Sequence, residues 1–171
     1  MWCSSILARA ILAAVVTAGS VGYANAQQFQ ALLSGLNEVP PVNSQGQGSV
    51  KLSLSGGSLS FTLIFTNLSA NAVAAHIHFA RSRENGGVIV FFCGGGGKPA
   101  CPASVSGSIS GTITAADVIG PAAQGVTAGD FGALATALVS QASYADIHTV
   151  NFPAGEIRGD IIQCPPNGCP F

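Results

Sequence analysis

Two of the three histidines in the chain lie one residue apart, in the segment AAHIHFA. Alternate side chains of an extended strand point to opposite faces, so His76 and His78 share one face while Ile77 and Phe79 share the other. The third histidine, His148, lies far along the chain in YADIHTV. Copper and zinc both accept neutral imidazole nitrogens as ligands. The spacing therefore makes the three histidines candidate ligands of a copper or zinc ion.

Charged residues accompany the third histidine in two C-terminal segments. Asp146 shares its strand face, and Glu156, Arg158 and Asp160 share one face of GEIRGDI. If both segments lie beside the strand of the histidine pair, one region of the protein gathers all these groups. We interpret the region first as a polar seam, in which Asp146, Glu156, Arg158 and Asp160 satisfy the histidines and one another, because a buried polar group without a partner costs about 1–3 kcal/mol.

A metal centre is the alternative interpretation of the same region. A carboxylate there would either complete the ligand set or orient an imidazole from outside it. No serine or cysteine nucleophile arrangement accompanies the histidines, so catalysis without a metal ranks third. The sequence leaves the choice between seam and metal open.

The elements that would hold these residues are mostly short strands. Eight segments show alternation or a short apolar run bounded by turn residues. They are FQALLSG, GSVKLSLS, SLSFTLIFTNL, AVAAHIHFA, GVIVFFC, SVSGSISGTIT, YADIHTV and GEIRGDII. The strongest hairpin prediction joins the second and third segments through Gly56 and Gly57.

Two short helices interrupt the strands. TAADVIG offers Thr114 as N-cap and Asp117 three residues later, and DFGALATALVSQ offers Asp130 as N-cap. The number and spacing of strands predict an all-β, antiparallel β-sandwich of about seven or eight strands. We expect one domain over residues 27–171, with a cysteine-closed C-terminal tail.

The N-terminal segment has the pattern of a secretory leader. One arginine precedes an apolar run and small residues that end in Ala24-Asn25-Ala26. We predict a signal peptide over residues 1–26, with an uncleaved anchor as the alternative, and hence a secreted or periplasmic protein. After cleavage we expect no integral membrane span. The NLS at 67–69 would make Asn67 a glycosylation acceptor only in a eukaryotic secretory route.

Four cysteines remain in the mature chain: Cys93, Cys101, Cys164 and Cys169. In an exported protein they predict two disulfides, for which three connectivities are possible. CGGGGKPAC and CPPNGC are turn-rich, which favours pairing within each segment. A cysteine zinc site is the weaker alternative because neither spacing is Cys-x-x-Cys.

The composition limits the partners that the protein can bind. Only 8% of residues are charged and the formal net charge is −1, so charge alone attracts neither nucleic acid nor an anionic membrane. A surface with so few charges also suits a protein partner, a surface, or self-association.

Four blocks resemble the CHRD domain, the module named after chordin. LSGLNEVPPV, AAHIHFA, SGTITAAD and IHT…NFPAGEIRGDI occur in the order of that family, between about Phe29 and Ile162. The resemblance implies an immunoglobulin-like sandwich without a defined activity. His76, His78, His148, Glu156 and Arg158 match pattern residues of the family, which gives them no established catalytic role. The segment FARSRENGG, the CGGGGKPAC insertion and the cysteine-closed tail depart from the pattern.

Together these observations predict an exported, non-enzymatic binding or scaffolding module of the cell envelope or extracellular space. We expect no cofactor under this interpretation. A copper- or zinc-binding protein that uses the three histidines is the alternative.

Overall fold

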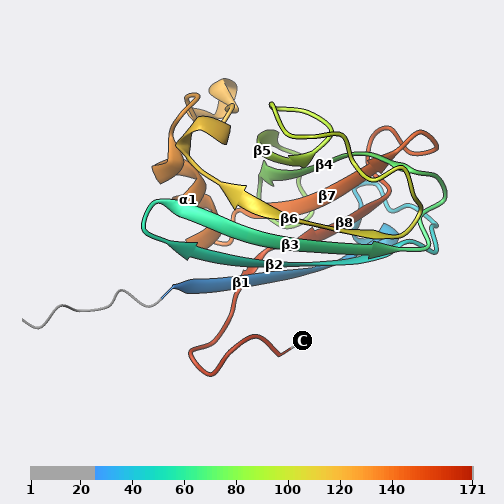
Figure 1. Ribbon diagram of the computed structural model, residues 1–171, viewed down its shortest axis with the longest axis horizontal. Helices are drawn as coiled ribbons and strands as arrows, with labels where there is room; N and C mark the ends of the chain where they lie inside the picture. Colours follow the sequence, from blue (N-terminus) through green and yellow to red (C-terminus); the bar gives the residue numbers. More distant parts are fainter. Residues whose placement is uncertain (1–25, 171) are drawn as a thin grey trace, which may run out of the picture.

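The computed structural model describes residues 26–170 (Figure 1). This part contains nine strands, one α-helix and three 3-10 helices. They are β1 (Gln27–Ser34), η1 (Gly35–Asn37), β2 (Gln47–Ser55), β3 (Ser58–Thr66), β4 (Ala72–Phe79), β5 (Gly87–Cys93), β6 (Gly107–Ile113), η2 (Ala115–Asp117), η3 (Ala122–Gln124), α1 (Phe131–Val139), β7 (Ser143–Thr149), β8 (Ile157–Asp160) and β9 (Ile162–Gln163). The predicted signal peptide lies outside the described residues, apart from Ala26, and stays a prediction.

The eight predicted strand segments correspond to β1 through β8. In β3 the alternation is regular, with Phe61 and Leu63 buried while Ser60 and Thr62 between them are exposed. Such a strand covers the core with one face and meets water with the other. The short β9 was not predicted as a separate strand.

The β2–β3 hairpin has the predicted turn. Gly56 and Gly57 have φ values of 56° and 80°, the left-handed conformation that a two-residue type I′ turn requires. Ser55 pairs with Ser58, and the register continues along both strands as far as Gln47 and Thr66. The turn therefore fixes which side chains of the hairpin enter the core.

All nine strands of the described residues belong to one antiparallel sheet, which confirms the predicted all-β, antiparallel class and leaves the sandwich arrangement unconfirmed. The strand order is β5-β4-β7-β8-β1-β2-β3-β6, and β9 pairs with β1. The sheet curls until its two end strands approach each other (Figure 1). Phe61 of β3 packs against Phe92 of β5 with ring centroids 4.7 Å apart. The result is an all-β, nearly barrel-like sheet, because β8 pairs with β7 on one side and with β1 on the other and so keeps the sheet continuous.

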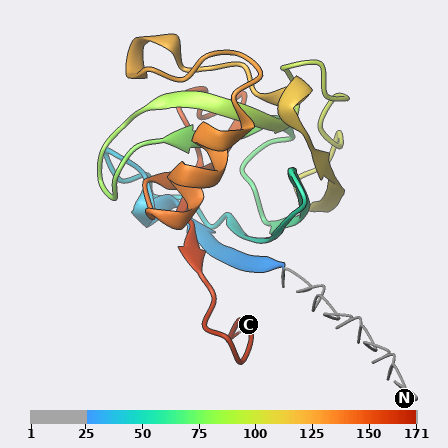
Figure 2. The ribbon, with the colours of Figure 1, turned by 90° about the vertical axis from the view of Figure 1, so that its left-hand side faces the viewer.

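Both predicted helix starts are present, although the first helix is only one 3-10 turn. In η2 the Thr114 backbone N–H donates to Asp117 Oδ2 at 2.7 Å. Before α1, Asp130 Oδ1 accepts from the Ala133 backbone N–H at 2.9 Å. Leu134 of α1 is fully buried in the core, and Figure 2 looks onto the helix. Thus α1 closes one side of the curled sheet.

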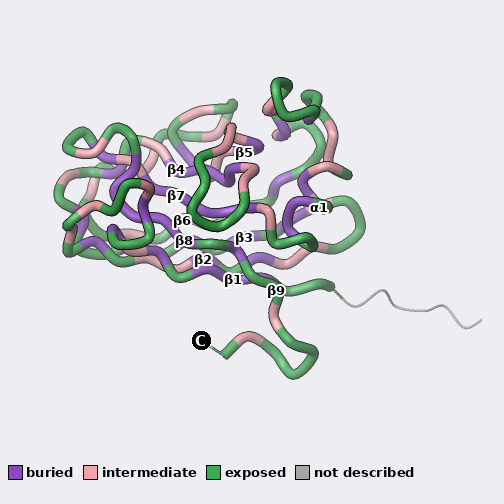
Figure 3. The backbone as a smooth tube through the Cα atoms, turned by 180° about the vertical axis from the view of Figure 1, so that it is seen from behind, coloured by how far each residue is buried: buried purple, intermediate pink, exposed green. Residues whose placement is uncertain are grey.

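Two disulfides join the cysteines within each segment, as predicted. Cys93 pairs with Cys101, and Cys164 pairs with Cys169. The Cys93–Cys101 bond ties the CGGGGKPAC insertion to the end of β5. The Cys164–Cys169 bond closes the C-terminal tail, which is largely exposed (Figure 3). Since all four cysteines form disulfides, they provide no zinc site.

No helix in residues 26–170 is both long and apolar enough to cross a membrane.

Candidate metal centre

The structure places the three strands that carry the candidate residues side by side. β7 lies between β4 and β8. In this register Asp146 pairs with His76 on one side and with Arg158 on the other, while His148 pairs with Ala74. The long-range proximity on which the sequence hypotheses depended is therefore present.

The three imidazoles converge on the outer face of this sheet region. Ile77 is fully buried in the core, so the flanking His76 and His78 point away from it. His76 Nδ1 lies 3.3 Å from His78 Nε2, and the ring centroids of His76 and His148 are 4.6 Å apart. One nitrogen from each histidine can be chosen so that all three lie within 4.8 Å of one another. An ion with bonds of about 2.0–2.1 Å needs separations near 3.4 Å, so the set contracts slightly on binding.

Backbone carbonyls fix the tautomers of two of these rings. His78 Nδ1 donates to Gly86 O at 2.9 Å, and His148 Nδ1 donates to Pro153 O at 3.0 Å. A carbonyl oxygen only accepts, so in the neutral rings the proton is on Nδ1 and Nε2 carries the lone pair. The lone pair of His78 Nε2 lies within hydrogen-bonding distance of His76 Nδ1, at 3.3 Å. His148 Nε2 is buried without a hydrogen-bond partner. Histidines that bind a metal usually donate their other ring N–H in this way, to a carbonyl or carboxylate that fixes the orientation of the ring.

Burial keeps the imidazoles neutral at pH 7. It lowers the pKa of His76 to about 3, with the neighbouring His148 and His78 adding to the effect. Burial also lowers the pKa of His78 to about 4, although its hydrogen bond to Gly86 acts in the opposite direction. The pKa of His148 is lowered by burial too. Neutral rings are the form that binds a metal ion.

A pair of buried carboxyl groups lies next to the imidazoles. Asp146 Oδ2 is 3.5 Å from His148 Nε2 and 3.9 Å from His78 Nε2. Glu38, which follows η1, lies beside Asp146: a Cβ on Gly155 would be 2.8 Å from Glu38 Oε1 and 3.0 Å from Asp146 Oδ1. Burial, followed by repulsion from Asp146, raises the pKa of Glu38 to about 8, and burial raises that of Asp146 to about 7. Glu38 Oε1 and Asp146 Oδ1 are both buried without a hydrogen-bond partner.

Arg158 and Tyr144 form the wall of the cluster on the β8 side. Tyr144 stacks on His78 with ring centroids 4.6 Å apart, and the Arg158 guanidinium lies 3.4 Å from the centre of the Tyr144 ring. Arg158 also donates to Glu84 O at 2.8 Å and to Asn85 Oδ1 at 3.1 Å. It thereby ties the loop after β4 down over the site.

Two predicted members of the polar seam do not join the histidines. The buried Glu156 carboxylate accepts hydrogen bonds from Ser44, Ser69 and Thr149, at 2.6–2.8 Å. Glu156 thereby links the segments of Ser44, Ser69 and Thr149 to one another, and it does not contact the imidazoles. Asp160 is partly exposed, with one carboxylate oxygen 3.9 Å from Arg158 Nη2.

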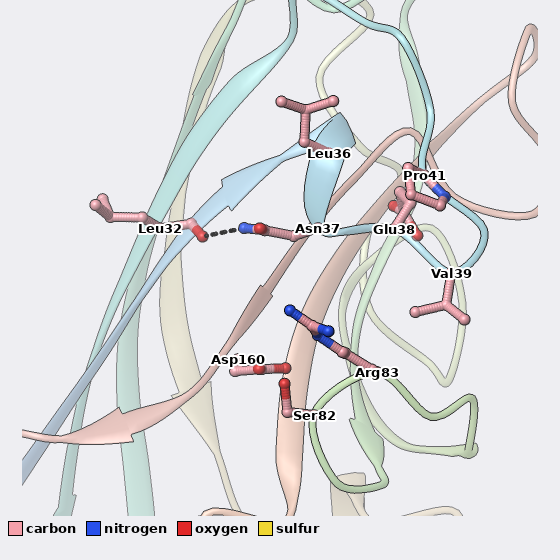
Figure 4. Close-up of a pocket in the computed structure, with 9 residues that line it drawn as sticks. All are labelled: Leu32, Leu36, Asn37, Glu38, Val39, Pro41, Ser82, Arg83 and Asp160. Atoms are coloured by element: carbon pink, nitrogen blue, oxygen red, sulfur yellow. Dashed lines mark hydrogen bonds between the residues drawn. The ribbon is translucent and has the colours of Figure 1, made fainter.

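A pocket of about 670 Å³ lies next to the carboxyl pair (Figure 4). Glu38 forms part of its wall, Leu36 lies at its rim, and Arg83 and Asp160 face it from the opposite side. None of the three histidines lines it. The pocket therefore approaches the histidine cluster only through Glu38.

The sequence did not reveal Glu38, Tyr144 or Asn85 as parts of this region. Glu38 and Asn85 lie in loops that cover the outer face, and no periodic pattern relates a loop residue to a distant strand. For Tyr144 a signal existed, because it is two residues before Asp146 in the same strand and so shares its face.

Fold and site define a disulfide-bonded, antiparallel all-β domain with a buried histidine and carboxylate cluster on its outer face. The family model of the CHRD domain matches residues 29–161, and the chain therefore belongs to this family. Comparison with curated proteins and with solved structures gives no match.

Proposed function

We propose that this CHRD-domain protein is an exported, non-enzymatic binding module that holds a copper or zinc ion through His76, His78 and His148. One observation carries the proposal. The chain has only three histidines, and segments about 70 residues apart bring all of them into one cluster.

The hydrogen bonds of the cluster support a metal ligand set over a self-sufficient polar seam. In a seam, each buried nitrogen would have a partner. Here the lone pair of His148 Nε2 faces Asp146 Oδ2 at 3.5 Å, and His148 Nε2 is buried without a hydrogen-bond partner. A cation between the two would satisfy both.

The burial of the cluster supports a binding role without turnover. The side chains of His78 and His148 are only 11% and 13% exposed. A substrate would have little room at an ion held by these rings, whereas a stored or structural ion needs none. The CHRD assignment is also compatible with a non-enzymatic module.

Metal analysis of the purified, disulfide-intact protein tests the proposal. We expect one copper or zinc ion per chain, and we expect its loss in His76→Ala and His148→Ala. Tyr144→Phe is the matched control, because it keeps the ring that stacks on His78 and removes no ligand. Folding of each variant is checked by circular dichroism. A parent protein that retains neither ion after equilibration with equimolar copper or zinc contradicts the proposal.

Export rests on the leader-like N-terminal segment, and two disulfides are compatible with an extracytoplasmic location. The mass of the protein recovered from the medium or the periplasm tests it. We expect a mature chain that begins at Gln27. Recovery only from the cytoplasm, at full length, contradicts export.

Scaffolding by self-association is a second candidate function. Leu32 and Leu36 are 53% and 74% exposed at the pocket of Figure 4, on a surface with few charges. Sedimentation equilibrium tests this: we expect a dimer that Leu36→Asp dissociates and that Val139→Asp, at an exposed position of α1, leaves intact. A monomeric parent protein at high concentration contradicts it.

A further inference from the structure

We propose that Asp146 is the fourth ligand of the ion and that Glu38 holds Asp146 in position, which closes the site at three nitrogens and one oxygen. This inference rests on the proposed function, because it concerns the ion held by the three histidines.

The first step is the placement of Asp146 Oδ2. It lies 3.5 Å from His148 Nε2 and 3.9 Å from His78 Nε2, and the His76 Nδ1 to His78 Nε2 distance is 3.3 Å. In a tetrahedral site with bonds of about 2.0–2.1 Å, ligand atoms are about 3.4 Å apart. The oxygen thus lies at about a ligand's distance from His148 Nε2 and somewhat farther from His78 Nε2.

The second step is the side of the ring that the carboxylate faces. A carboxylate that only orients a metal-bound histidine accepts from the N–H on the far side of the ring. In this protein Gly86 O and Pro153 O occupy those positions on His78 and His148. Asp146 faces the lone-pair side instead, which is the side on which an ion binds.

The third step is the difference between the surroundings of the two oxygens of Asp146. While Oδ2 faces the imidazoles, Oδ1 is buried without a hydrogen-bond donor and lies on the side of Glu38. Glu38 packs on this side of the carboxyl group, so Oδ1 stays beside Glu38 and Oδ2 is left facing the imidazoles, free to bind the ion. Gly155 makes this arrangement possible, because a side chain there would collide with both carboxyl groups and its φ of 126° also disfavours other residues.

The proposed ligand set indicates which metal ions the site should prefer. Three imidazoles and a carboxylate suit Zn(II) or Cu(II), whereas Cu(I) gains little from a hard oxygen ligand. Four protein ligands also leave no open position, the property of structural rather than catalytic zinc sites.

The experiment measures Zn(II) and Cu(I) affinities by chelator competition for the parent, Asp146→Asn and Glu38→Gln. For Asp146→Asn we expect Zn(II) affinity to fall by about 100-fold or more, beyond the roughly 10–100-fold typical of supporting residues, and we expect that smaller range for Glu38→Gln. Cu(I) affinity should change much less in both. Asp160→Asn is the matched control, since the Asp160 side chain is 42% exposed and its nearest charged group is Arg158, at 3.9 Å, rather than an imidazole.

The possible outcomes separate the two proposals. If Asp146→Asn binds Zn(II) as tightly as the parent while His148→Ala does not, the fourth ligand is wrong and the histidine site stands. If the parent binds neither metal, the proposed function fails and the inference fails with it. Equal losses of Zn(II) and Cu(I) affinity also overturn the ligand role, because they indicate a general disturbance of the site. If Asp146→Asn does not fold, Glu38→Gln decides, and unchanged Zn(II) affinity overturns the proposal.

Discussion

The buried polar residues of β4, β7 and β8 differ in how their hydrogen-bonding capacity is met. Glu156 accepts hydrogen bonds at both of its carboxylate oxygens. Arg158 donates hydrogen bonds to the loop after β4, and its guanidinium plane stacks on the Tyr144 ring. His148 Nε2 and Asp146 Oδ1, in contrast, are buried and unpaired. At the scale of single residues, the first pair stabilises the fold, while the second pair leaves buried polar atoms unsatisfied beside the proposed ion site.

Glu156 should make stability depend on pH. Burial alone would raise its pKa, but hydrogen bonds from Ser44, Thr149 and Ser69 outweigh burial and lower it. A carboxyl group with a lowered folded-state pKa contributes stability above its ordinary value of 4.5 and loses that contribution as the pH falls. We expect Glu156→Gln to lower the unfolding free energy by about 2 kcal/mol at pH 7. In urea titrations this deficit should shrink toward pH 3, and a deficit independent of pH would disagree with the assignment.

Arg158 should contribute strongly to stability. Its replacement by leucine removes a cation from the Tyr144 ring and two charged donors from the loop after β4. We expect a loss of about 3 kcal/mol in the unfolding free energy at neutral pH. Arg158→Lys should lie between leucine and the parent, because it keeps the charge but not the planar fork. Equal stabilities of the lysine and leucine variants would argue against the fork geometry.

At the scale of elements, the β2–β3 hairpin shows how local chemistry sets the register of long strands. Its turn needs two residues with positive φ, and nothing lies within 4 Å of a Cβ built at Gly56 or Gly57. The cost of a side chain there comes from the backbone conformation and not from a collision.

A pair of substitutions at Gly56 tests this statement. Gly56→Val should destabilise the protein by about 1–2 kcal/mol, because a β-branched residue is strained at positive φ. Gly56→Asn should be close to neutral, since asparagine is favoured at the first position of a type I′ turn. Thermal or urea unfolding measures both. Similar losses for valine and asparagine would indicate a steric origin instead.

Residues 26–170 form one curled sheet, and the strands near its two ends pack against each other in the core. Phe61 and Phe92 come from β3 and β5, which are far apart in the strand order yet in contact in space. The Cys93–Cys101 bond lies at the end of β5, on this contact between sheet ends, whereas the Cys164–Cys169 bond lies in the exposed tail.

The two disulfides should therefore differ in their effect on global stability. The double variant of Cys93 and Cys101 to alanine should lose about 2.5 kcal/mol, the value that the chain-entropy model gives for so short a loop, because both ends of this loop are fixed in the folded body. The corresponding variant of Cys164 and Cys169 should unfold at nearly the parent's urea concentration, since the tail packs little against the sheet. A larger loss for the tail variant would contradict this assignment.

Much of the fold could be predicted because it depends on neighbours in the sequence. Alternation in SLSFTLIF, the Gly56-Gly57 turn, the Asp130 cap and the pairing of nearby cysteines are each set by the covalent geometry of a few consecutive residues. Alternation also showed correctly that His76 and His78 share a face, since that depends only on their being two residues apart in a strand.

Tertiary structure decided the rest, because it depends on how distant segments meet. The same alternation grouped Glu156 with the histidines, but the loops of Ser44 and Ser69 draw its carboxylate away. Glu38 reaches Asp146 only because the loop after η1 folds over β7, next to Gly155. A strand pattern specifies which way a side chain points, whereas the contacts that side chain makes follow from the curl of the sheet and the loops that cover it.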